Sequence, residues 1–187
     1  MERDDRTRKS KTLSYVLRHA PESVGLTLDR GGYVAVDTLL AALSAHGKAL
    51  TREEVEEIVR LDAKGRYQLA EGRIRAVQGH STDQVELEFE ERSPPPLLFH
   101  GTSSAVKAPI LKEGLKPQGR HLVHLSAELE TAKAVGRRHV KRGEQLVVFG
   151  VDTAALGARG TRFFIARNGV WLVESAPGDC LQVIFEG

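Results

Sequence analysis

The amino-acid sequence predicts a protein of the α+β class, which combines helices with antiparallel strands. In its first half, three segments carry apolar residues at helical spacing, and two hairpin patterns accompany them. In its second half, short apolar runs typical of strands outnumber the helical patterns. Between the halves, residues 93–96 are Ser-Pro-Pro-Pro, and successive prolines cannot continue a helix or a central strand. We therefore expect two lobes, residues 1–93 and residues 94–187.

The first lobe is predicted to begin with a helix. Apolar residues at positions 13, 16, 17 and 20 fall on one helical face, and Pro21 disfavours the helical conformation for the residue before it. The helix should therefore end near residue 20. Residues 26–28 and 33–36 flank an Asp/Gly turn and are expected to pair as a β-hairpin.

Two further helices and a second hairpin complete this lobe. Asp37 is positioned to cap a helix that should end at Gly47. Thr51 and Glu54 form the capping-box pattern at the start of the next helix. Residues 66–69 and 74–77 then predict a hairpin around Glu-Gly.

Helices followed by a hairpin resemble a winged helix, which commonly binds nucleic acid, so a DNA-binding regulator is one interpretation. The candidate recognition helix argues against reading of DNA bases. It holds four glutamates between residues 52 and 61, and their carboxylates would repel the phosphates that flank a major groove.

The second lobe is predicted to be rich in strands. Helices are expected around Ile110, ending at Gly114, and around Ala132, with Ser126 as its cap. Asn168-Gly169 is a strong signal for a hairpin turn between two short strands. The remaining strands are expected at residues 97–102, 122–126 and 145–151, and a final buried strand at residues 181–185.

The composition is that of a soluble globular protein. Of the 187 residues, 41% are hydrophobic and 28% are charged, and the net charge of +2 is too small to indicate a partner. Its distribution is informative: the net charge is +2 over residues 1–82, −4 over residues 83–93 and +4 over residues 94–187. Two basic blocks are compatible with an anionic partner such as RNA.

Several classes of protein are excluded or disfavoured. No apolar run approaches the roughly 20 residues of a membrane span, and residues 1–11 lack the apolar core of a signal peptide, so no membrane partner is expected. Cys180 is the single cysteine, which excludes an internal disulfide and favours the cytoplasm. The histidines lack zinc-binding spacing, so we expect no metal. Neither a Rossmann nor a P-loop glycine motif is present.

Arg18 and His19 lie side by side at the predicted end of the first helix. A guanidinium beside a titratable imidazole suits a phosphate, because one offers a bidentate fork and the other a proton. Two cations at a helix C-terminus also stabilise the helix dipole. This pair alone leaves the two interpretations open.

Other polar residues lie at the borders of predicted strands, where side chains often line a binding site. They are His100, Gly101, Thr102, His124, Ser126, Asn168 and Gly169. Together with Arg18, His19, Arg66, Arg75 and Arg120 they predict a basic cleft between the lobes that binds a phosphorylated ligand.

The order of the motifs resembles that of the RNA 2′-phosphotransferases of the Tpt1/KptA family over nearly the whole chain. The motifs are residues 13–19 (LSYVLRH), 32–34 (GYV), 62–67 (DAKGRY), 74–81 (IRAVQGHS), 99–102 (FHGT), 120–126 (RHLVHLS) and 168–172 (NGVWL). Tyr67 stands where the family usually has phenylalanine, Val77 where we expect asparagine, and Val173 where threonine is common.

The resemblance implies a fold and a set of site residues. It implies an N-terminal winged-helix-like RNA-binding lobe and a C-terminal ADP-ribosyltransferase-like lobe that binds NAD. The implied catalytic residues are Arg18, His19, Arg66 and Arg120. Lys64 and Arg75 are expected to contact the RNA phosphate or act in a second step. The NAD side is expected to comprise His100, Gly101, Thr102, Ser126, Asn168 and Gly169.

The implied activity is NAD-dependent transfer of an internal RNA 2′-phosphate to NAD. The expected products are 2′-hydroxyl RNA, nicotinamide and ADP-ribose 1″,2″-cyclic phosphate, formed through an ADP-ribosylated RNA 2′-phosphate. The enzyme is expected to be a cytoplasmic monomer that acts in RNA repair or tRNA splicing and uses NAD and 2′-phosphorylated RNA. Two alternatives are an ADP-ribosyltransferase that caps terminal phosphates of RNA or DNA, and a non-catalytic RNA-binding module.

Overall fold

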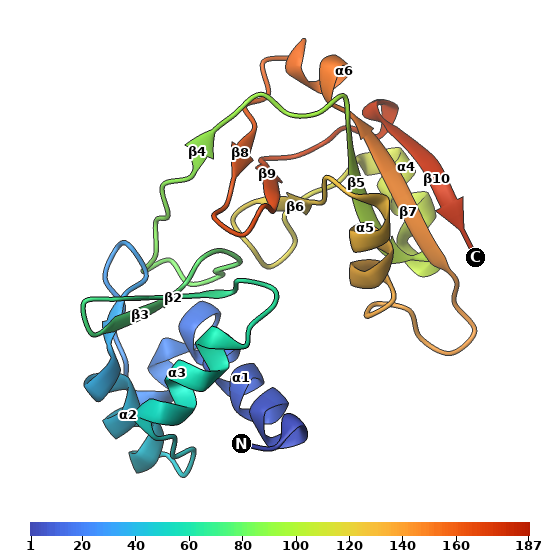
Figure 1. The fold of residues 1–187 in the computed structure, drawn as a ribbon. Helices are drawn as coiled ribbons and strands as arrows, with labels where there is room; N and C mark the ends of the chain where they lie inside the picture. Colours follow the sequence, from blue (N-terminus) through green and yellow to red (C-terminus); the bar gives the residue numbers. More distant parts are fainter. The chain divides into compact units, whose positions relative to one another are not determined.

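The computed structural model describes residues 1–187 and divides into two compact units, Met1–Glu88 and Phe89–Gly187. Both units contain helices and antiparallel sheets, so the α+β class is confirmed (Figure 1). The division lies a few residues before the predicted boundary. Residues 90–91 form strand β4 (Glu90–Glu91), which pairs with strand β8 (Phe164–Ile165) of the second unit. None of the helices is both long enough and apolar enough to cross a membrane.

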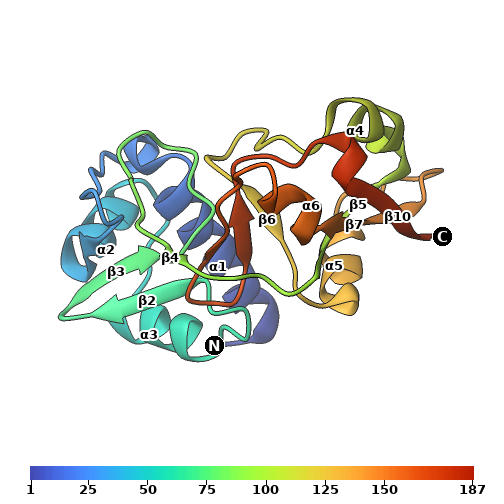
Figure 2. The ribbon, with the colours of Figure 1, turned by 90° about the horizontal axis from the view of Figure 1, so that it is seen from above.

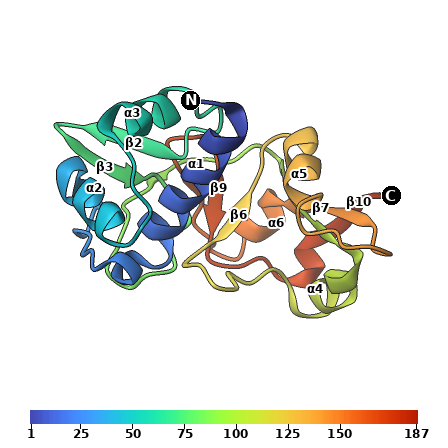
Figure 3. The same ribbon diagram turned by 90° about the horizontal axis from the view of Figure 1, so that it is seen from below.

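The first unit combines three helices with one small antiparallel sheet. Its elements in chain order are α1 (Arg3–Arg18), the 3-10 helix η1 (Pro21–Val24), β1 (Val34–Ala35), α2 (Val36–Ala45), α3 (Arg52–Arg60), β2 (Tyr67–Ala70) and β3 (Arg73–Ala76). The three α-helices are grouped together (Figure 3), and the sheet has the order β1-β3-β2, with β2 and β3 seen side by side in Figure 2. Leu13, Leu17, Leu39, Ile58 and Ile74 are fully or almost fully buried in its core.

The local signals of this unit are largely confirmed. Both hydrogen bonds of the capping box are present at Thr51 and Glu54. Helix α2 ends at Ala45, with His46 as its C-cap and Gly47 in the left-handed conformation at φ 68°. The β2–β3 hairpin forms around Glu71-Gly72. Helix α1 begins at Arg3, ten residues before the predicted apolar face. Its first turns are polar, so the spacing of apolar residues does not reveal where it begins.

Two expectations for the first unit are wrong. Residues 26–28 form no strand; Val34 pairs instead with Ile74, so β1 is completed by a strand distant in sequence. Asp37 is not the cap of α2, which begins at Val36 with Ala35 at the N-cap position. The Asp37 carboxylate forms an ion pair with Arg52 at the start of α3.

The second unit contains two antiparallel sheets. Its remaining elements are β5 (Leu97–Ser103), the 3-10 helix η2 (Ser104–Val106), α4 (Lys107–Glu113), β6 (Val123–Leu125), α5 (Leu129–Gly136), β7 (Leu146–Asp152), α6 (Thr153–Gly157), β9 (Trp171–Val173), the 3-10 helix η3 (Gly178–Cys180) and β10 (Leu181–Glu186). One sheet has the order β10-β7-β5, and the other has the order β4-β8-β9-β6. An antiparallel bridge between Phe99 and Ser126 connects them.

Helix α5 lies beside β5 and β7 (Figure 1). Glycine allows the helix and β5 to approach closely. A Cβ atom at Gly101 would lie 1.9 Å from the carbonyl oxygen of Ala132, so no other residue fits there without displacing the helix. Because side chains alternate along a strand, His100 and Thr102 lie on the face of β5 opposite to α5.

Two expectations for the second unit are also wrong. Glu128, not Ser126, is the N-cap of α5, because both main-chain groups of Ser126 are bonded to Phe99. Strand β10 is not buried: it is an edge strand, and Val183 and Ile184 are 37% and 38% exposed. The predictions for α4, β7 and the Asn168-Gly169 hairpin are confirmed.

Candidate functional site

The first group of predicted site residues lies at the C-terminal end of α1. Leu13, Val16 and Leu17 are completely buried and set the orientation of the helix. Arg18 is its last residue and is only 8% exposed, whereas His19 is the C-cap residue and lies on the surface. The pair therefore occupies a helix end, as the sequence predicts.

A segment far along the chain, residues 78–81, contacts this helix end. Gly79 has φ 86°, and a Cβ atom there would lie 3.7 Å from three atoms of the Arg18 guanidinium group. The Ser81 amide donates a hydrogen bond of 2.9 Å to the carbonyl oxygen of Arg18. The Ser81 hydroxyl lies 2.9 Å from Nδ1 of His19. Both members of the pair are thus contacted by residues of the 74–81 motif, whose place beside the helix end the sequence pattern does not reveal.

Asp62 holds Arg66 through several hydrogen bonds. Nε and Nη2 of Arg66 donate to Oδ1 of Asp62 at 2.9 and 2.7 Å, and the Arg66 amide donates to Oδ2. The Asp62 side chain is 2% exposed. Burial by itself raises the pKa of this carboxyl, but the hydrogen bonds from Arg66 outweigh burial and leave the pKa below its ordinary value.

Arg18 and Arg66 both lie near Tyr67. The Arg66 guanidinium is 5.6 Å from the centre of the Tyr67 ring, and the charges of Arg66 and Arg18 both act to lower the pKa of the Tyr67 hydroxyl. Burial has the larger effect, so the net pKa of Tyr67 is raised. The hydroxyl donates to the carbonyl oxygen of Ser10 at 2.6 Å, a contact that phenylalanine would lack. The first unit therefore brings Arg18, His19 and Arg66 into one basic cluster.

Lys64 and Arg75 have different surroundings. Lys64 is exposed, and its amide contacts Asp62 Oδ1 at 3.4 Å within the turn that carries Arg66. Arg75 is half-buried and donates to Gln68 and to the Gly31 carbonyl oxygen, both at 3.0 Å. Its guanidinium also lies 4.6 Å from the centre of the Tyr33 ring. These contacts give Arg75 a packing role on the β2–β3 hairpin.

In the second unit, His100 is held on β5 by a hydrogen bond to a neighbouring strand. Its Nδ1 lies 3.1 Å from the carbonyl oxygen of His124, so Nδ1 carries the hydrogen and Nε2 is an acceptor in the neutral ring. Burial lowers the pKa of His100, and the charges of His139 and Arg120 lower it further, against the opposing effect of this hydrogen bond. The effect of Arg120 indicates that the structure brings Arg120 near His100.

The other predicted residues of this unit are spread over three places. Thr102 is buried on the same face of β5 as His100. The Ser126 amide and carbonyl form two 2.8 Å hydrogen bonds with Phe99, next to His100. Asn168 and Gly169 form the turn between β8 and β9, with Gly169 at φ 79°. The face of Gly101 that would approach a ligand is covered by α5, which contradicts the reason for predicting that glycine as a binding residue.

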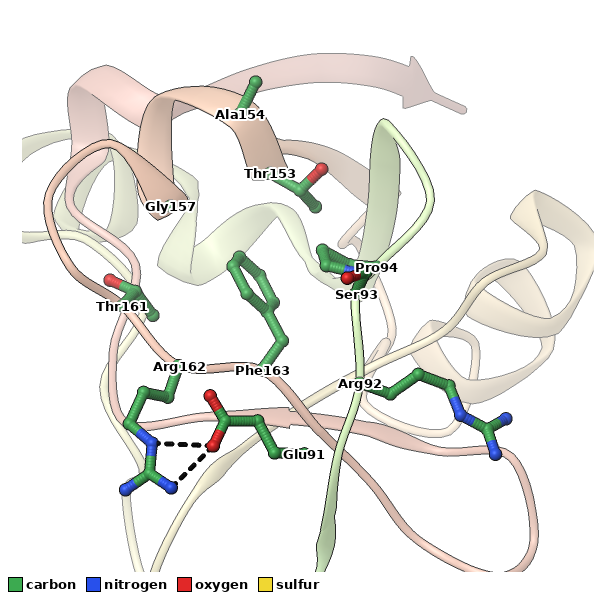
Figure 4. A pocket seen from close by; sticks show the side chains of 10 residues that line it. All are labelled: Glu91, Arg92, Ser93, Pro94, Thr153, Ala154, Gly157, Thr161, Arg162 and Phe163. Atoms are coloured by element: carbon green, nitrogen blue, oxygen red, sulfur yellow. Dashed lines mark hydrogen bonds and ion pairs between the residues drawn. The ribbon is translucent and has the colours of Figure 1, made fainter.

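An open pocket of about 360 Å³ lies elsewhere in the second unit (Figure 4). It is lined by Glu91, Arg92, Ser93, Pro94, Thr153, Ala154, Gly157, Thr161, Arg162 and Phe163. None of the predicted site residues lines it, and an ion pair between Arg162 and Glu91 borders it. No group of three histidine, cysteine, aspartate or glutamate side chains could hold a metal ion.

Comparison with known families decides the assignment of the chain. Residues 4–175 match the family model described as RNA 2′-phosphotransferase, Tpt1/KptA family. The chain belongs to this family. The resemblance drawn from the sequence motifs is therefore confirmed, and the matched residues include every predicted site residue.

Members of the Tpt1/KptA family from diverse bacteria are similar over nearly the whole chain. A protein of Pseudomonas syringae pv. tomato described as a probable RNA 2′-phosphotransferase is 48% identical over 186 residues, covering 98% of this chain and 97% of the relative. One of Rhizobium johnstonii with the same description is 49% identical over 176 residues, covering 94% and 93%. One of Streptomyces coelicolor is 44% identical over 182 residues, covering 97% of each.

Proposed function

We propose that this protein is an NAD-dependent RNA 2′-phosphotransferase. The observation that carries the proposal is membership of the Tpt1/KptA family over residues 4–175. The basic cluster of Arg18, His19 and Arg66 supports it, because guanidinium and imidazole groups suit a phosphate. The substrate is an RNA that carries an internal 2′-phosphate, and NAD is the acceptor of that phosphate. We also propose that it acts as a monomer in the cytoplasm; its single cysteine, Cys180, fits a reducing compartment.

In the first proposed step, the RNA 2′-phosphate attacks C1″ of NAD and nicotinamide leaves. A phosphate is already anionic at neutral pH, so this step requires no general base. It requires that the phosphate be oriented and its charge be balanced. Arg66 is suited to this role, because Asp62 holds its side chain in one orientation. Arg18 is suited because it is buried and its guanidinium group lies against Gly79.

In the second proposed step, the ribose 2″-hydroxyl attacks phosphorus and the RNA 2′-oxygen leaves. This step yields 2′-hydroxyl RNA and ADP-ribose 1″,2″-cyclic phosphate. Negative charge accumulates on the phosphoryl oxygens, so Arg18, Arg66 and Arg120 contribute electrostatically. His19 contacts the phosphate or protonates the leaving oxygen. Lys64 follows Asp62 in the turn that carries Arg66 and contributes a further charge to this step.

We propose that the second unit binds NAD as an ADP-ribosyltransferase-like lobe. His100 and Thr102 share one face of β5, and the neutral His100 ring presents Nε2 as an acceptor that suits a ribose hydroxyl. Ser126 lies beside this face, and Asn168-Gly169 and Arg120 complete the proposed set. Gly101 acts indirectly, because its Cα faces α5 and the close packing of that helix positions β5.

We propose that the first unit is a winged-helix-like lobe that binds the RNA. Recognition through α3 is disfavoured, because this helix carries Glu53, Glu54, Glu56 and Glu57. Glu54 is paired with Lys9, and Glu57 is paired with Arg6 and the chain N-terminus. These carboxylates therefore stabilise the helical core of the unit, and RNA contact is assigned to the end of α1 and the turn before β2.

The test is incubation of the protein with NAD and one of two oligonucleotides. One oligoribonucleotide carries an internal 2′-phosphate, and the other carries only a 5′-phosphate. The proposal expects nicotinamide, 2′-hydroxyl RNA and the cyclic phosphate from the first substrate, and no reaction without NAD. If only the terminal phosphate gains ADP-ribose, the capping activity is the correct function. If RNA stimulates no nicotinamide release, the protein is a binding module.

A further inference from the structure

A loop in the second unit carries a concentration of positive charge that the proposed function does not use. It follows α5, leads into β7 (Figure 1), and has the sequence Arg-Arg-His-Val-Lys-Arg over residues 137–142. We call these six residues the basic loop. Its three arginines, its lysine and His139 are all exposed. The loop therefore presents several cations together to solvent.

The protein does not neutralise these cations with its own carboxylates. Four cations elsewhere on the surface of this unit each pair with an aspartate or a glutamate: Arg92, Lys116, Arg159 and Arg162. By contrast, no ion pair involves the four cations of the basic loop, which are Arg137, Arg138, Lys141 and Arg142. A group of exposed cations without carboxylate partners is available to an external anion.

The carboxylate that follows the basic loop, Glu144, holds the loop in place. Its Oε2 accepts a hydrogen bond of 2.9 Å from the Lys141 amide and one of 2.6 Å from the Ser103 hydroxyl at the end of β5. The Glu144 amide donates in return to the Lys141 carbonyl oxygen at 3.0 Å. These bonds close the turn and attach it to the sheet. An ordered loop of this kind loses less conformational entropy on binding than a flexible tail does.

The basic loop lies close to the strand that carries two of the proposed NAD residues, His100 and Thr102. The Gln145 amide donates to the Ser104 hydroxyl at 3.0 Å, and the Ser104 amide donates to the Gln145 carbonyl oxygen at 2.8 Å. The chain that leaves the loop is thereby paired with the residue that follows β5. Burial is the main cause of the lowered pKa of His100, and the charge of His139 lowers this pKa further. A strand of RNA on the basic loop would therefore lie near the proposed NAD residues of this unit.

Phosphodiesters are the anions that this arrangement fits. Guanidinium and ammonium groups suit phosphate oxygens, and residues 137–144 have a net charge of +3, from four cations and one carboxylate with the histidine neutral. The loop offers no aromatic side chain on which a base could stack, which favours contact with the RNA backbone over readout of its sequence. Its one apolar residue, Val140, packs against the core, so the loop has no apolar anchor for a lipid bilayer.

We propose that the basic loop, residues 137–142, is a second RNA-binding element that holds the phosphodiester backbone of the substrate without regard to its base sequence. It adds a contact in the second unit to those assigned to the end of α1 and the turn before β2. The inference rests on the proposed function for the identity of the RNA as a substrate. The contact itself is measurable without NAD and without a 2′-phosphate.

The first test measures binding of a fluorescent oligoribonucleotide that has no 2′-phosphate, at several salt concentrations and without NAD. The loop variant of the full chain combines Arg137→Gln, Arg138→Gln, Lys141→Gln and Arg142→Gln. Each cation that neutralises a phosphate of a single strand contributes about 0.7 to the slope of log K against log salt concentration. The loop variant should therefore reduce the slope by about 2–3 and raise Kd at low salt on the order of tenfold or more.

Two further variants separate the loop from net charge and from loss of fold. The matched control combines Arg92→Gln, Lys116→Gln, Arg159→Gln and Arg162→Gln, which removes the same number of charges from the same unit and should change the slope much less. The charge-preserving variant combines Arg137→Lys, Arg138→Lys and Arg142→Lys and should keep most of the wild-type slope. An unchanged slope in the loop variant, or equal reductions in the loop variant and the matched control, would overturn the proposal.

The second test measures steady-state turnover of 2′-phosphorylated RNA with NAD. The loop variant should raise KM for the RNA, with KM for NAD and kcat close to those of the wild type, because the loop binds substrate away from the reacting phosphate. A raised KM for NAD with an unchanged KM for RNA would show that the loop binds the dinucleotide, which overturns the proposal.

Vesicles of phosphatidylcholine and phosphatidylserine test the other anionic partner that a basic loop could meet. The proposal expects no loop-dependent binding to them at physiological salt concentration. If the loop variant loses vesicle binding and keeps RNA binding, the loop is a membrane contact and the proposal is overturned. If the wild type shows no turnover of 2′-phosphorylated RNA, the proposed function fails, and the salt dependence of RNA binding still decides the role of the loop.

Discussion

Gly101 of β5 and Gly136 at the end of α5 meet backbone to backbone. A Cβ atom at Gly136 would lie 2.8 Å from the carbonyl carbon of Gly101, and one at Gly101 would lie 3.0 Å from the Gly136 amide nitrogen. This close approach places α5 on the face of β5 to which Gly101 points, and because side chains alternate along a strand, His100 and Thr102 lie on the other face. A pair of glycines 35 positions apart thus lets the helix pack directly against the backbone of the strand.

We predict that Gly101→Ala destabilises the protein strongly. The added methyl group would lie 1.9 Å from the Ala132 carbonyl oxygen, and main-chain atoms cannot move aside as a flexible side chain can. The expected loss in the free energy of unfolding is about 3 kcal/mol or more. Urea denaturation measures it, with Gly119→Ala as the control, because nothing lies within 4 Å of a Cβ at Gly119. Equal loss in the two variants would contradict the packing argument.

Arg18→Ala, Arg66→Ala and Arg120→Ala should each lower the rate of 2′-phosphate removal at least a hundredfold. Each removes a guanidinium proposed to stabilise charge in the transition state, an effect on the order of 3 kcal/mol. Single-turnover kinetics with NAD and 2′-phosphorylated RNA measure the rates. Arg73→Ala is the control and should retain most activity. Arg73 lies on the β2–β3 hairpin, and its guanidinium forms an ion pair with Asp29. Near-normal rates in all three variants would refute the assigned roles.

Asp62→Asn should weaken both the fold of the turn and the activity. Asparagine retains one acceptor oxygen, but it cannot receive both the Arg66 guanidinium and the Arg66 amide as the carboxylate does. We expect a loss of about 1–3 kcal/mol in the free energy of unfolding. Asp37→Asn, which removes an exposed ion pair with Arg52, should cost less than about 1 kcal/mol. Similar losses of unfolding free energy in the two variants would show that the buried hydrogen bonds of Asp62 contribute no more to stability than the exposed ion pair of Asp37.

The pKa of Asp62 adds a prediction about acid. Its folded-state pKa lies below the ordinary value of 3.8, so the unfolded state binds the proton more readily. The contribution of Asp62 to stability is therefore complete above 3.8 and is lost as the pH falls through the lower, folded-state pKa. The free energy of unfolding of Asp62→Asn should thus depend less on pH in this range than that of the wild type, and identical pH slopes would contradict the prediction.

His100 should make the second unit sensitive to milder acid. Burial lowers its folded-state pKa below 6.5, so the unfolded state binds more protons between the two values and stability rises with pH there. The contribution is complete above 6.5 and is lost on acidification towards the folded-state pKa. His100→Gln should flatten this part of the profile, and His46→Gln, at an exposed position of the first unit, should leave it unchanged. Thermal unfolding between pH 5 and 8 provides the comparison.

Local signals were read correctly where the interactions that produce them are local. The capping box of Thr51 and Glu54, the glycine end of α2 and the Asn168-Gly169 turn each depend on residues within a few positions of one another. The prediction of a hairpin at residues 26–36 is wrong because Val34 pairs with Ile74. The alternation of apolar and polar residues does not indicate which other strand a strand will pair with. The prediction that β10 is buried is wrong for a related reason: an apolar run does not reveal whether a strand lies at the edge of a sheet.

The sequence by itself determined the α+β class, the C-terminal ends of α2 and α4, the capped start of α3 and the family to which the chain belongs, and it singled out Arg18, His19 and Arg66. The tertiary structure alone decided what those residues contact. Ser81 contacts His19, Gly79 lies against Arg18, and Tyr67 lies near Arg66 while its hydroxyl bonds to Ser10 of α1. It also decided that Gly101 packs against a helix. The physical reason is how far apart in the sequence the interacting residues lie. Caps and turns are hydrogen bonds between neighbours in the chain, whereas the contacts that orient a site join residues that are distant in sequence and meet only when the core forms.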